Sequence, residues 1–346
     1  MPASSSAADP PAHAPRLHHD PVSGRAVFVA PMRAARPHDA DRPADADTTA
    51  TPRDWCPFCV GSEHRTPPAW LRTPADAAEP WRARIVPNLY PFTIERPDAG
   101  EAAGGQGPRP PRAAHGVHDV VIEAARHERT VTAVAADAWR DVWELCRQRL
   151  DTLAGRSDLA WATVFKNSGP QAGASLEHLH SQLVALDFVP GVVQAEMAAV
   201  TRSPGLFADV ISSADRAGRV VAERADLVML VPDAPRQPFE TWILPRTPEP
   251  FFHATTPARV AAVADLTQLY VARLERLLPG SHFNWWLHQL PFSTRVPAAA
   301  RAAWHWHLEI LPRLSAFAGF ELATGCHITP LSPAESAARL RSPVTP

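Results

Sequence analysis

The sequence predicts an α+β fold in which one unit, built from antiparallel strands and a packed helix, occurs twice. Three observations lead to this prediction. Segments with strand and helix patterns follow one another in the same order in both halves of the chain. In each half this series ends in a His-x-His pattern. The order of the segments fits an antiparallel sheet that carries helices better than it fits βαβ winding.

Composition agrees with a globular protein. A chain of 346 residues suits two domains or one duplicated unit, and 45% hydrophobic residues suffice for a core. The net charge of -2, with acids and bases mixed, argues against nucleic-acid or polybasic membrane binding. No apolar run approaches the ~18 residues of a membrane span, and residues 1–15 lack the apolar core of a signal peptide. We therefore expect a cytoplasmic protein.

The first half is predicted to cover residues 16–190, after a small, polar, Pro-rich tail at 1–15 that we expect to be disordered. Its predicted elements are a hairpin over Arg16–Pro37 with a turn at 21–24, a loop over His38–Arg53, a strand at Ala83–Val86 and a Gly/Pro-rich excursion over Glu95–Ala114. The repeated unit follows, with a strand at Val117–Ala124, a helix at Ala133–Gly155, a strand at Trp161–Phe165 and a strand that carries His178 and His180.

The second half, residues 191–346, repeats that order. Its predicted elements are a strand pair over Gly218–Val231, a strand at Glu240–Pro245, an amphipathic helix at Pro257–Leu278 and strands at Phe283–His288 and Trp304–Leu311. The last strand carries His305, His307 and Glu309 at alternate positions. Two copies of the same series indicate an internal duplication.

The pattern His178-x-His180-x-Gln182 carries the most chemical information. Residues at i, i+2 and i+4 of a strand project to one face, so two imidazoles and an amide would share a site. Imidazole serves as nucleophile, proton carrier or metal ligand, and a neutral amide can hold a phosphate oxygen. This combination indicates phosphoryl or nucleotidyl transfer through a covalent histidine. Taken alone, so short a pattern is more often a strand with two hydrogen-bonded histidines.

Two groups of residues are candidates for metal ligands. Cys56 and Cys59 have the spacing of zinc thiolates, and their further ligands would come from the imidazoles at positions 115, 118, 127 and 178. A redox pair is the weaker alternative, because no thioredoxin-like context surrounds it. The triplet of His305, His307 and Glu309 is a second metal site or a pair of core histidines. Cys146 and Cys326 are expected to be buried small hydrophobic residues.

Several short motifs occur in one order along nearly the whole chain. They lie at 31–37, 56–59, 86–91, 118–123, 165–169, 173–175, 178–182, 238–245, 305–309 and 319–321. Each motif alone is weak, but together the chain resembles the galactose-1-phosphate uridylyltransferase family, a branch of the histidine-triad superfamily, from about Arg16 to Arg341. Leu179 departs from the family pattern, which usually has proline between the two histidines. The resemblance implies a duplicated histidine-triad-like fold.

The resemblance also implies roles for individual residues. His180 is implied as the nucleophile and Gln182 as the phosphate-binding amide that replaces the third histidine of hydrolytic relatives. Cys56, Cys59, His127 and His178 are implied to bind a structural zinc, and Glu196, His288, His305 and His307 a second metal, iron or zinc. Contacts to nucleotide and phosphates are implied for Asn88, Asn167, Gly173 and Ser175, and contacts to the hexose phosphate and diphosphate for Arg33 and Arg36.

The implied activity is ping-pong transfer of UMP from UDP-glucose to a hexose 1-phosphate, galactose 1-phosphate by family default. The alternatives are an ADP-sugar or other nucleotide-sugar phosphorylase that uses inorganic phosphate, and a nucleotide-sugar binding protein without catalysis. The expected partners are therefore a nucleotide sugar and a sugar 1-phosphate. Family members often form dimers that share active sites, but the sequence alone shows no such contact here.

Overall fold

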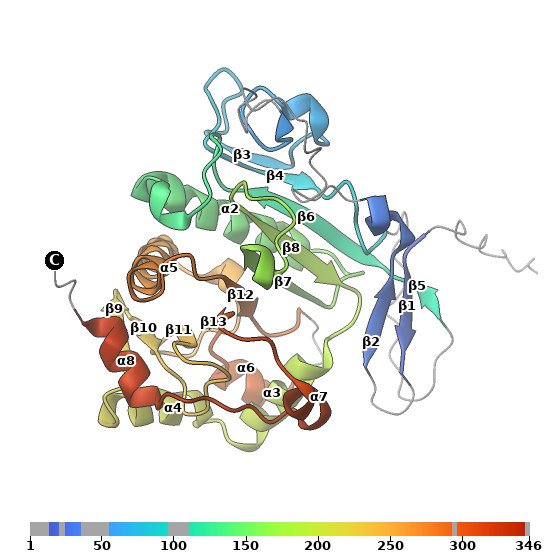
Figure 1. The fold of residues 1–346 in the computed structure, drawn as a ribbon. Helices are drawn as coiled ribbons and strands as arrows, with labels where there is room; N and C mark the ends of the chain where they lie inside the picture. The colour runs from blue at the N-terminus through green and yellow to red at the C-terminus, as the bar shows by residue number, and fades with distance from the viewer. Residues whose placement is uncertain (1–13, 21–24, 36–54, 96–110, 293–295, 343–346) are drawn as a thin grey trace, which may run out of the picture.

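A ten-stranded antiparallel sheet forms the centre of the protein (Figure 1). The computed structural model describes residues 14–20, 25–35, 55–95, 111–292 and 296–342. From edge to edge, the strands are β3 (Leu71–Thr73), β4 (Ala83–Pro87), β6 (Gly116–Ile122), β8 (His180–Leu186), β7 (Trp161–Ser168), β12 (Phe283–His288), β13 (His307–Pro312), β11 (Thr241–Pro245), β10 (Leu227–Leu230) and β9 (Val220–Arg224).

The sheet contains the same arrangement twice. Counted from its middle outwards, one side has the order β7-β8-β6-β4-β3 and the other has β12-β13-β11-β10-β9. Helix α2 (Ala136–Ala154) follows β6 and precedes β7, and α5 (Pro257–Leu277) stands in the same place between β11 and β12. The two sides meet where β7 pairs with β12, from Phe165 opposite Trp286 to Ser168 opposite Phe283. The predicted α+β fold with a duplicated unit is confirmed.

Helices α2 and α5 pack against one face of the sheet and against each other. Each presents a stripe of buried residues at helical spacing, such as Trp139, Val142 and Leu150 on α2. Between the helices, the indole N–H of Trp139 donates a hydrogen bond of 3.0 Å to the hydroxyl of Thr267 on α5. This buried pair joins the two repeats in one core.

The opposite face of the sheet has a second core. Successive residues of a strand point to opposite faces, so Leu183 of β8 joins the core of α2 and α5, whereas Val184 joins this second core. Its covering helices are α3 (Gly191–Arg202), α4 (Leu206–Arg216) and α6 (Ala298–Ala303). Other helices in the described residues are α7 (Gly319–Thr324) and α8 (Pro333–Arg341), and short 3-10 turns lie at Pro31–Ala35, Glu63–Arg65, Val131–Ala133, Pro170–Ala172 and Phe252–Ala254.

A small sheet of β2 (Ala26–Val29), β1 (Arg16–His19) and β5 (Arg112–Ala113) stands beside the large one (Figure 1). Antiparallel pairing of β1 and β2 confirms the predicted hairpin. Its turn at 21–24, the predicted loop His38–Arg53, residues 96–110 of the Gly/Pro-rich excursion and residues 1–13 of the predicted tail lie outside the described residues. Ala14 and Pro15, which end that tail, are buried.

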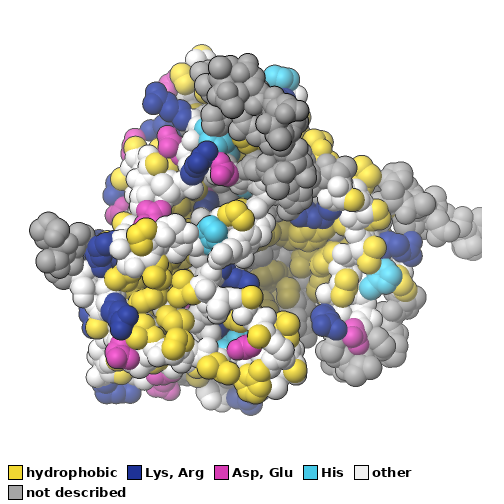
Figure 2. Space-filling view, in the orientation of Figure 1, with side chains coloured by type: hydrophobic (Ala, Val, Ile, Leu, Met, Phe, Trp, Pro, Cys, Tyr) yellow, Lys and Arg dark blue, Asp and Glu magenta, His cyan; other side chains and the backbone are white. Residues whose placement is uncertain are grey.

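Charged side chains of both signs are interspersed on the face shown in Figure 2, and apolar side chains gather on its lower part. Among the exposed apolar residues are Phe320 and Leu322 of α7. Within the described part of the chain, no helix combines the length and the apolar composition that a membrane crossing requires.

Two sequence-based expectations need correction. Strand β8 begins at His180 and β13 at His307, so His178 and His305 precede the strands in which we placed them. The reason is that the backbone at these positions bonds to loops: Leu179 N–H donates to Glu128 O at 2.8 Å, and Trp306 N–H donates to Glu249 O at 2.8 Å. Cys326 is exposed, whereas Cys146 is buried as expected.

Candidate active site

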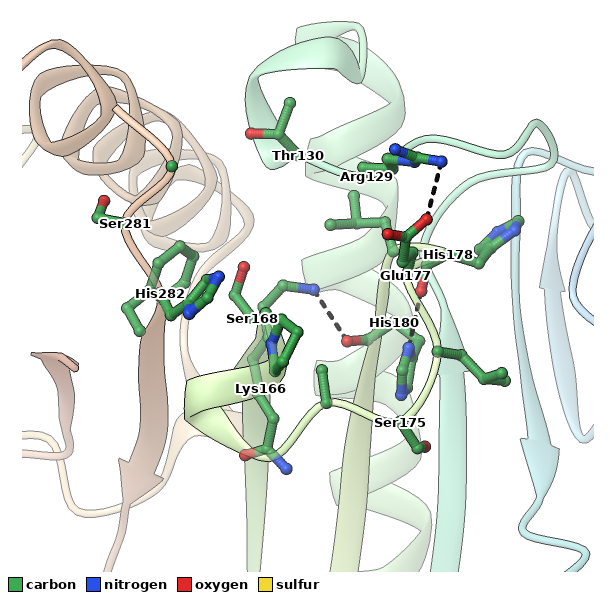
Figure 3. Close-up of a pocket in the computed structure, with 18 of the residues that line it drawn as sticks. Arg129, Thr130, Lys166, Ser168, Ser175, Glu177, His178, His180, Ser281 and His282 are labelled. Carbon is green, nitrogen blue, oxygen red and sulfur yellow. Dashed lines mark hydrogen bonds and ion pairs between the residues drawn. The ribbon is translucent and has the colours of Figure 1, made fainter. Parts of the chain in front are cut away.

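A cavity of about 510 Å³ lies where the end of β7, the start of β8 and the start of β12 come together (Figure 3). His180 lines it from β8, and Asn167 from β7. Ser175 lines it from the loop that joins these two strands. On the other side, the lining comes from the second half of the chain and includes His282, next to β12. The sequence motifs of the first half therefore face the second repeat across this cavity.

The ring of His180 is oriented by its own backbone environment. Its Nδ1 lies 2.8 Å from the carbonyl oxygen of His178. A carbonyl only accepts, so Nδ1 carries the proton, and the neutral ring has its lone pair on Nε2. The ring of Phe58 packs against it at 5.3 Å between centroids. A ring held in this tautomer meets the requirement for a histidine nucleophile.

A buried ion pair lies beneath the start of β8. Lys166, the only lysine of the chain, forms an ion pair with Glu123, and both side chains are 1% exposed. The ammonium also donates to the carbonyl oxygen of His180 at 2.9 Å, a contact drawn in Figure 3. The second carboxylate oxygen of Glu123 accepts from the Ser181 hydroxyl. Burial lowers the pKa of Lys166, and the neighbouring Glu123 carboxylate opposes that shift. This network fixes the backbone that carries His180.

Gln182 belongs to a second network on the face of His180. Its Oε1 lies 2.8 Å from Nε2 of His118 on β6. The same Nε2 lies 3.0 Å from Nδ2 of Asn88. Arg33 donates to the carbonyl oxygen of Tyr90 at 3.0 Å, two residues beyond Asn88. Asn88 and Gln182, both implied as contacts of nucleotide or phosphate, thus contact His118, and Arg33 bonds to the segment that follows Asn88.

Cys56, Cys59, His127 and His178 form one cluster, in which their ligand atoms lie within 4.8 Å of one another. Nδ1 of His178 is 3.5 Å from both sulfur atoms, and Nδ1 of His127 is 3.5 Å from Cys59 Sγ. Zinc bond lengths of ~2.3 Å to sulfur and ~2.0 Å to nitrogen, at tetrahedral angles, give sulfur–nitrogen distances of about 3.5 Å. The four residues therefore fit a structural zinc site.

Burial keeps both the Cys56 thiol and the His178 imidazole of this cluster in their neutral forms. Burial raises the pKa of the Cys56 thiol to about 12, so in the absence of a cation this thiol stays protonated at neutral pH. Burial lowers the pKa of His178 to about 3, so its ring is neutral and able to coordinate. Nε2 of His178 is held by the carbonyl oxygen of Ala124 at 2.9 Å, which leaves Nδ1 directed at the sulfurs.

A second cluster lies in the second repeat and consists of Glu196, His288, His307 and Glu309. Nδ1 of His288 is 3.0 Å from Glu196 and 3.6 Å from Glu309. Imidazole and carboxylate ligands suit iron or zinc. Burial would raise the pKa of Glu309, but the hydrogen bond from His307 and the charge of Arg236 lower it to about 2. His305 lies outside this group of four, and its Nδ1 is 2.7 Å from the carbonyl oxygen of Pro245. Of the triplet His305, His307 and Glu309 considered in the sequence, the last two are in the group.

The structure places the other predicted residues as follows. Gly173 has φ +84°, a left-handed conformation that favours glycine, in the turn before Ser175. Arg36 lies outside the described residues. The roles of Lys166, Glu123 and His282 were not predicted from the sequence, and His118, a candidate zinc ligand there, lies instead beside Gln182. Two signals pointed to them: Lys166 is unique in the chain, and positions 118 and 123 begin and end a family motif.

Comparison with known proteins identifies the family. Residues 116–344 match the model described as "Domain of unknown function (DUF4921)". ADP-glucose phosphorylase from Arabidopsis thaliana is 30% identical over 94% of this chain and 92% of its own length. The galactose-1-phosphate uridylyltransferase of Thermotoga maritima is 23% identical over 94% of this chain and 97% of its own.

The chain belongs to the galactose-1-phosphate uridylyltransferase family. Solved structures of this family agree with the fold. The crystal structure of the Arabidopsis thaliana ADP-glucose phosphorylase with bound ADP-glucose has a TM-score of 0.73 at 29% identity, and covers 95% of this chain and 99% of its own. An X-ray structure of a GalT-like protein from the same plant has a TM-score of 0.74 at 28% identity, with the same coverage. The family and fold predicted from the sequence are confirmed.

Proposed function

We propose that the protein transfers a nucleotidyl group from a nucleotide sugar through a covalent intermediate on His180. In the first step, Nε2 of His180 attacks the α-phosphorus; a P–N bond forms, and the P–O bond to the departing sugar 1-phosphate breaks. In the second step, an oxygen of the acceptor phosphate attacks the same phosphorus, and the P–N bond breaks to restore His180. Atoms and charges balance without a further reactant.

The orientation of the His180 ring carries this proposal. With the Nδ1 proton held by the His178 carbonyl at 2.8 Å, Nε2 has the lone pair, and the ring lines a cavity large enough for a nucleotide. Gln182 supplies an amide where a third histidine would supply a proton. An amide cannot protonate a leaving group, so the intermediate survives until an acceptor arrives. We assign nucleotide binding to Asn167, Gly173 and Ser175, and binding of the phosphates to Asn88, Arg33 and Arg36.

Two combinations of a nucleotide-sugar donor and a phosphate acceptor are candidates for the substrates of this site. The family resemblance implies UDP-glucose with galactose 1-phosphate. The 30% identity to an ADP-glucose phosphorylase, against 23% to a uridylyltransferase over the same share of this chain, favours ADP-glucose with inorganic phosphate. We therefore propose phosphorolysis of ADP-glucose, with ADP and glucose 1-phosphate as products, as the first candidate. Uridylyl exchange is the second.

We propose zinc for Cys56, Cys59, His127 and His178. When bound, it would supply a rigid cross-link between the Cys-x-x-Cys loop and the segment that enters β8. The cluster of Glu196, His288, His307 and Glu309 is proposed to take iron or zinc. We place the boundary between the two repeats at residues 190 and 191, between β8 and α3.

The test is the intact mass of the protein after incubation with one nucleotide sugar and no acceptor. ADP-glucose should add one adenylyl group, and inorganic phosphate should remove it. His180→Gly should form no adduct, whereas His115→Gly, a matched change at a histidine outside the cavity, should form it normally. An adduct from UDP-glucose that galactose 1-phosphate discharges would select the second candidate. Absence of any adduct would refute the covalent mechanism.

A further inference from the structure

His118 and Gln182 are buried neighbours on adjacent strands. Gln182 pairs with Val120 in the ladder between β6 and β8, so His118, two residues before Val120, is its diagonal neighbour on the same face. Both side chains are at least nine-tenths buried. The contact of 2.8 Å between His118 Nε2 and Gln182 Oε1 therefore forms out of reach of bulk water. In such surroundings, one hydrogen bond decides how an amide is turned.

The backbone of Phe92 decides which nitrogen of His118 carries the proton. Its N–H donates to Nδ1 of His118 at 3.4 Å. Nδ1 must then hold a lone pair, and the neutral ring carries its proton on Nε2. That Nε2–H donates to Oε1 of Gln182, which turns the NH2 group of Gln182 away from His118. The Phe92 ring, 4.3 Å from the His118 ring between centroids, fixes the imidazole in place.

The orientation of the Asn88 amide is also fixed by a hydrogen bond. Its Oδ1 accepts the Tyr90 backbone N–H at 2.8 Å, which identifies the atom 3.0 Å from His118 Nε2 as the amide nitrogen. A protonated Nε2 cannot accept a hydrogen bond from that NH2 group. The 3.0 Å approach of Asn88 Nδ2 to Nε2 is therefore not a hydrogen bond in this tautomer, and the proton on Nε2 goes to Gln182.

We infer that His118 is a positioning residue that fixes the Gln182 amide as a hydrogen-bond donor toward a phosphate oxygen of the substrate. This inference rests on the proposed function, in which Gln182 binds phosphate. In the other tautomer, Nε2 would accept from Asn88, and Gln182 would have to turn its NH2 to His118. Oε1 would then face an anionic oxygen, and the contact would be repulsive. The tautomer of His118 thus decides whether the site attracts or repels the charge that develops on the phosphate.

A double-mutant cycle tests the inference, with the rate of adduct formation at saturating nucleotide sugar as the readout. Loss of the Gln182 donor in Gln182→Ala should slow this rate by about 100-fold. His118→Ala should slow it by a similar factor, and His118→Gln, whose amide N–H reaches about as far as Nε2, should recover most of the rate. In the Gln182→Ala background, His118→Ala should cause no further loss, because it acts only through Gln182.

Zinc content and thermal unfolding of each variant show whether the fold is retained, and His115→Ala is the control for loss of an imidazole next to β6. Two results would overturn the inference. One is a double variant whose rate of adduct formation falls by the product of the two single factors. The other is a His118→Gln variant that is no faster than His118→Ala. Those results leave the proposed function standing if the wild-type protein forms its adduct. A wild-type protein that forms no adduct with ADP-glucose or UDP-glucose would overturn both.

Discussion

Replacement of Lys166 by methionine removes the only positive charge of the buried pair beneath His180. Methionine has a similar length and no charge, so the change leaves little empty space. The carboxylate of Glu123 remains 1% exposed and loses its cationic partner. The carbonyl oxygen of His180 also loses the hydrogen bond of 2.9 Å from the ammonium.

The expected loss is large because one buried charge is left alone. Removal of one partner of a buried ion pair destabilises a protein by about 3–5 kcal/mol, whereas replacement of both partners is close to neutral. Lys166→Met should therefore lower the free energy of unfolding by about 3–5 kcal/mol. The double variant Lys166→Met with Glu123→Gln should recover most of this loss, because the amide that replaces the carboxylate carries no charge and can still accept from Ser181.

Urea denaturation followed by tryptophan fluorescence measures this free energy, since 11 tryptophans report on the fold. The matched control is Arg129→Met, which breaks the Arg129–Glu177 pair at the cavity rim, where the side chains are 61% and 47% exposed. That exposed pair should contribute less than about 1 kcal/mol. A Lys166→Met variant as stable as the control, or a double variant no more stable than Lys166→Met, would refute the reasoning.

Three further predictions concern the metal cluster and the cavity. His178→Ala should lose zinc and unfold at lower temperature, because a structural metal contributes to folding; zinc content by atomic absorption checks it, and a normal content would exclude His178 as a ligand. Zinc affinity should rise with pH by up to about 100-fold per pH unit, because both thiols must release a proton, whereas His178, with a pKa of about 3, is already neutral. Competition with a chromophoric chelator measures this slope, and a flat profile would contradict thiolate ligation. Gly169→Ala should destabilise the protein by about 1–3 kcal/mol, because φ is +83° and the new Cβ would lie 1.9 Å from Cδ2 of His282. In urea denaturation, His282→Ala should relieve part of that cost, and equal losses with and without His282 would show that the ring is not the obstacle.

The fold was largely predictable because its signals are local. Helical spacing of apolar residues in α2 and α5, and the repeated order of elements around them, were sufficient to predict the duplicated unit. The grouping of Cys56 and Cys59 with His127 and His178 followed from the family resemblance, and the structure brings these four residues together.

Contacts that depend on strand pairing could not be predicted in the same way. Gln182 meets His118, and Lys166 meets Glu123, only because β8 lies between β6 and β7 in a particular register. No local pattern encodes which strands become neighbours. Both His305 and Glu309 were candidates for the second cluster, and the structure groups Glu309 with Glu196, His288 and His307.

The pairing of β7 with β12 has a consequence for motion. Proteins built from two similar halves often close over a ligand by a hinge between them. Here the halves share backbone hydrogen bonds in the middle of one sheet, and α2 packs on α5 across the same boundary. A hinge motion would have to break both. In the proposed reaction, nucleotide entry and product release are therefore left to the loops at the strand ends, such as 169–175 and 278–282, and the turnover rate should follow the mobility of these loops.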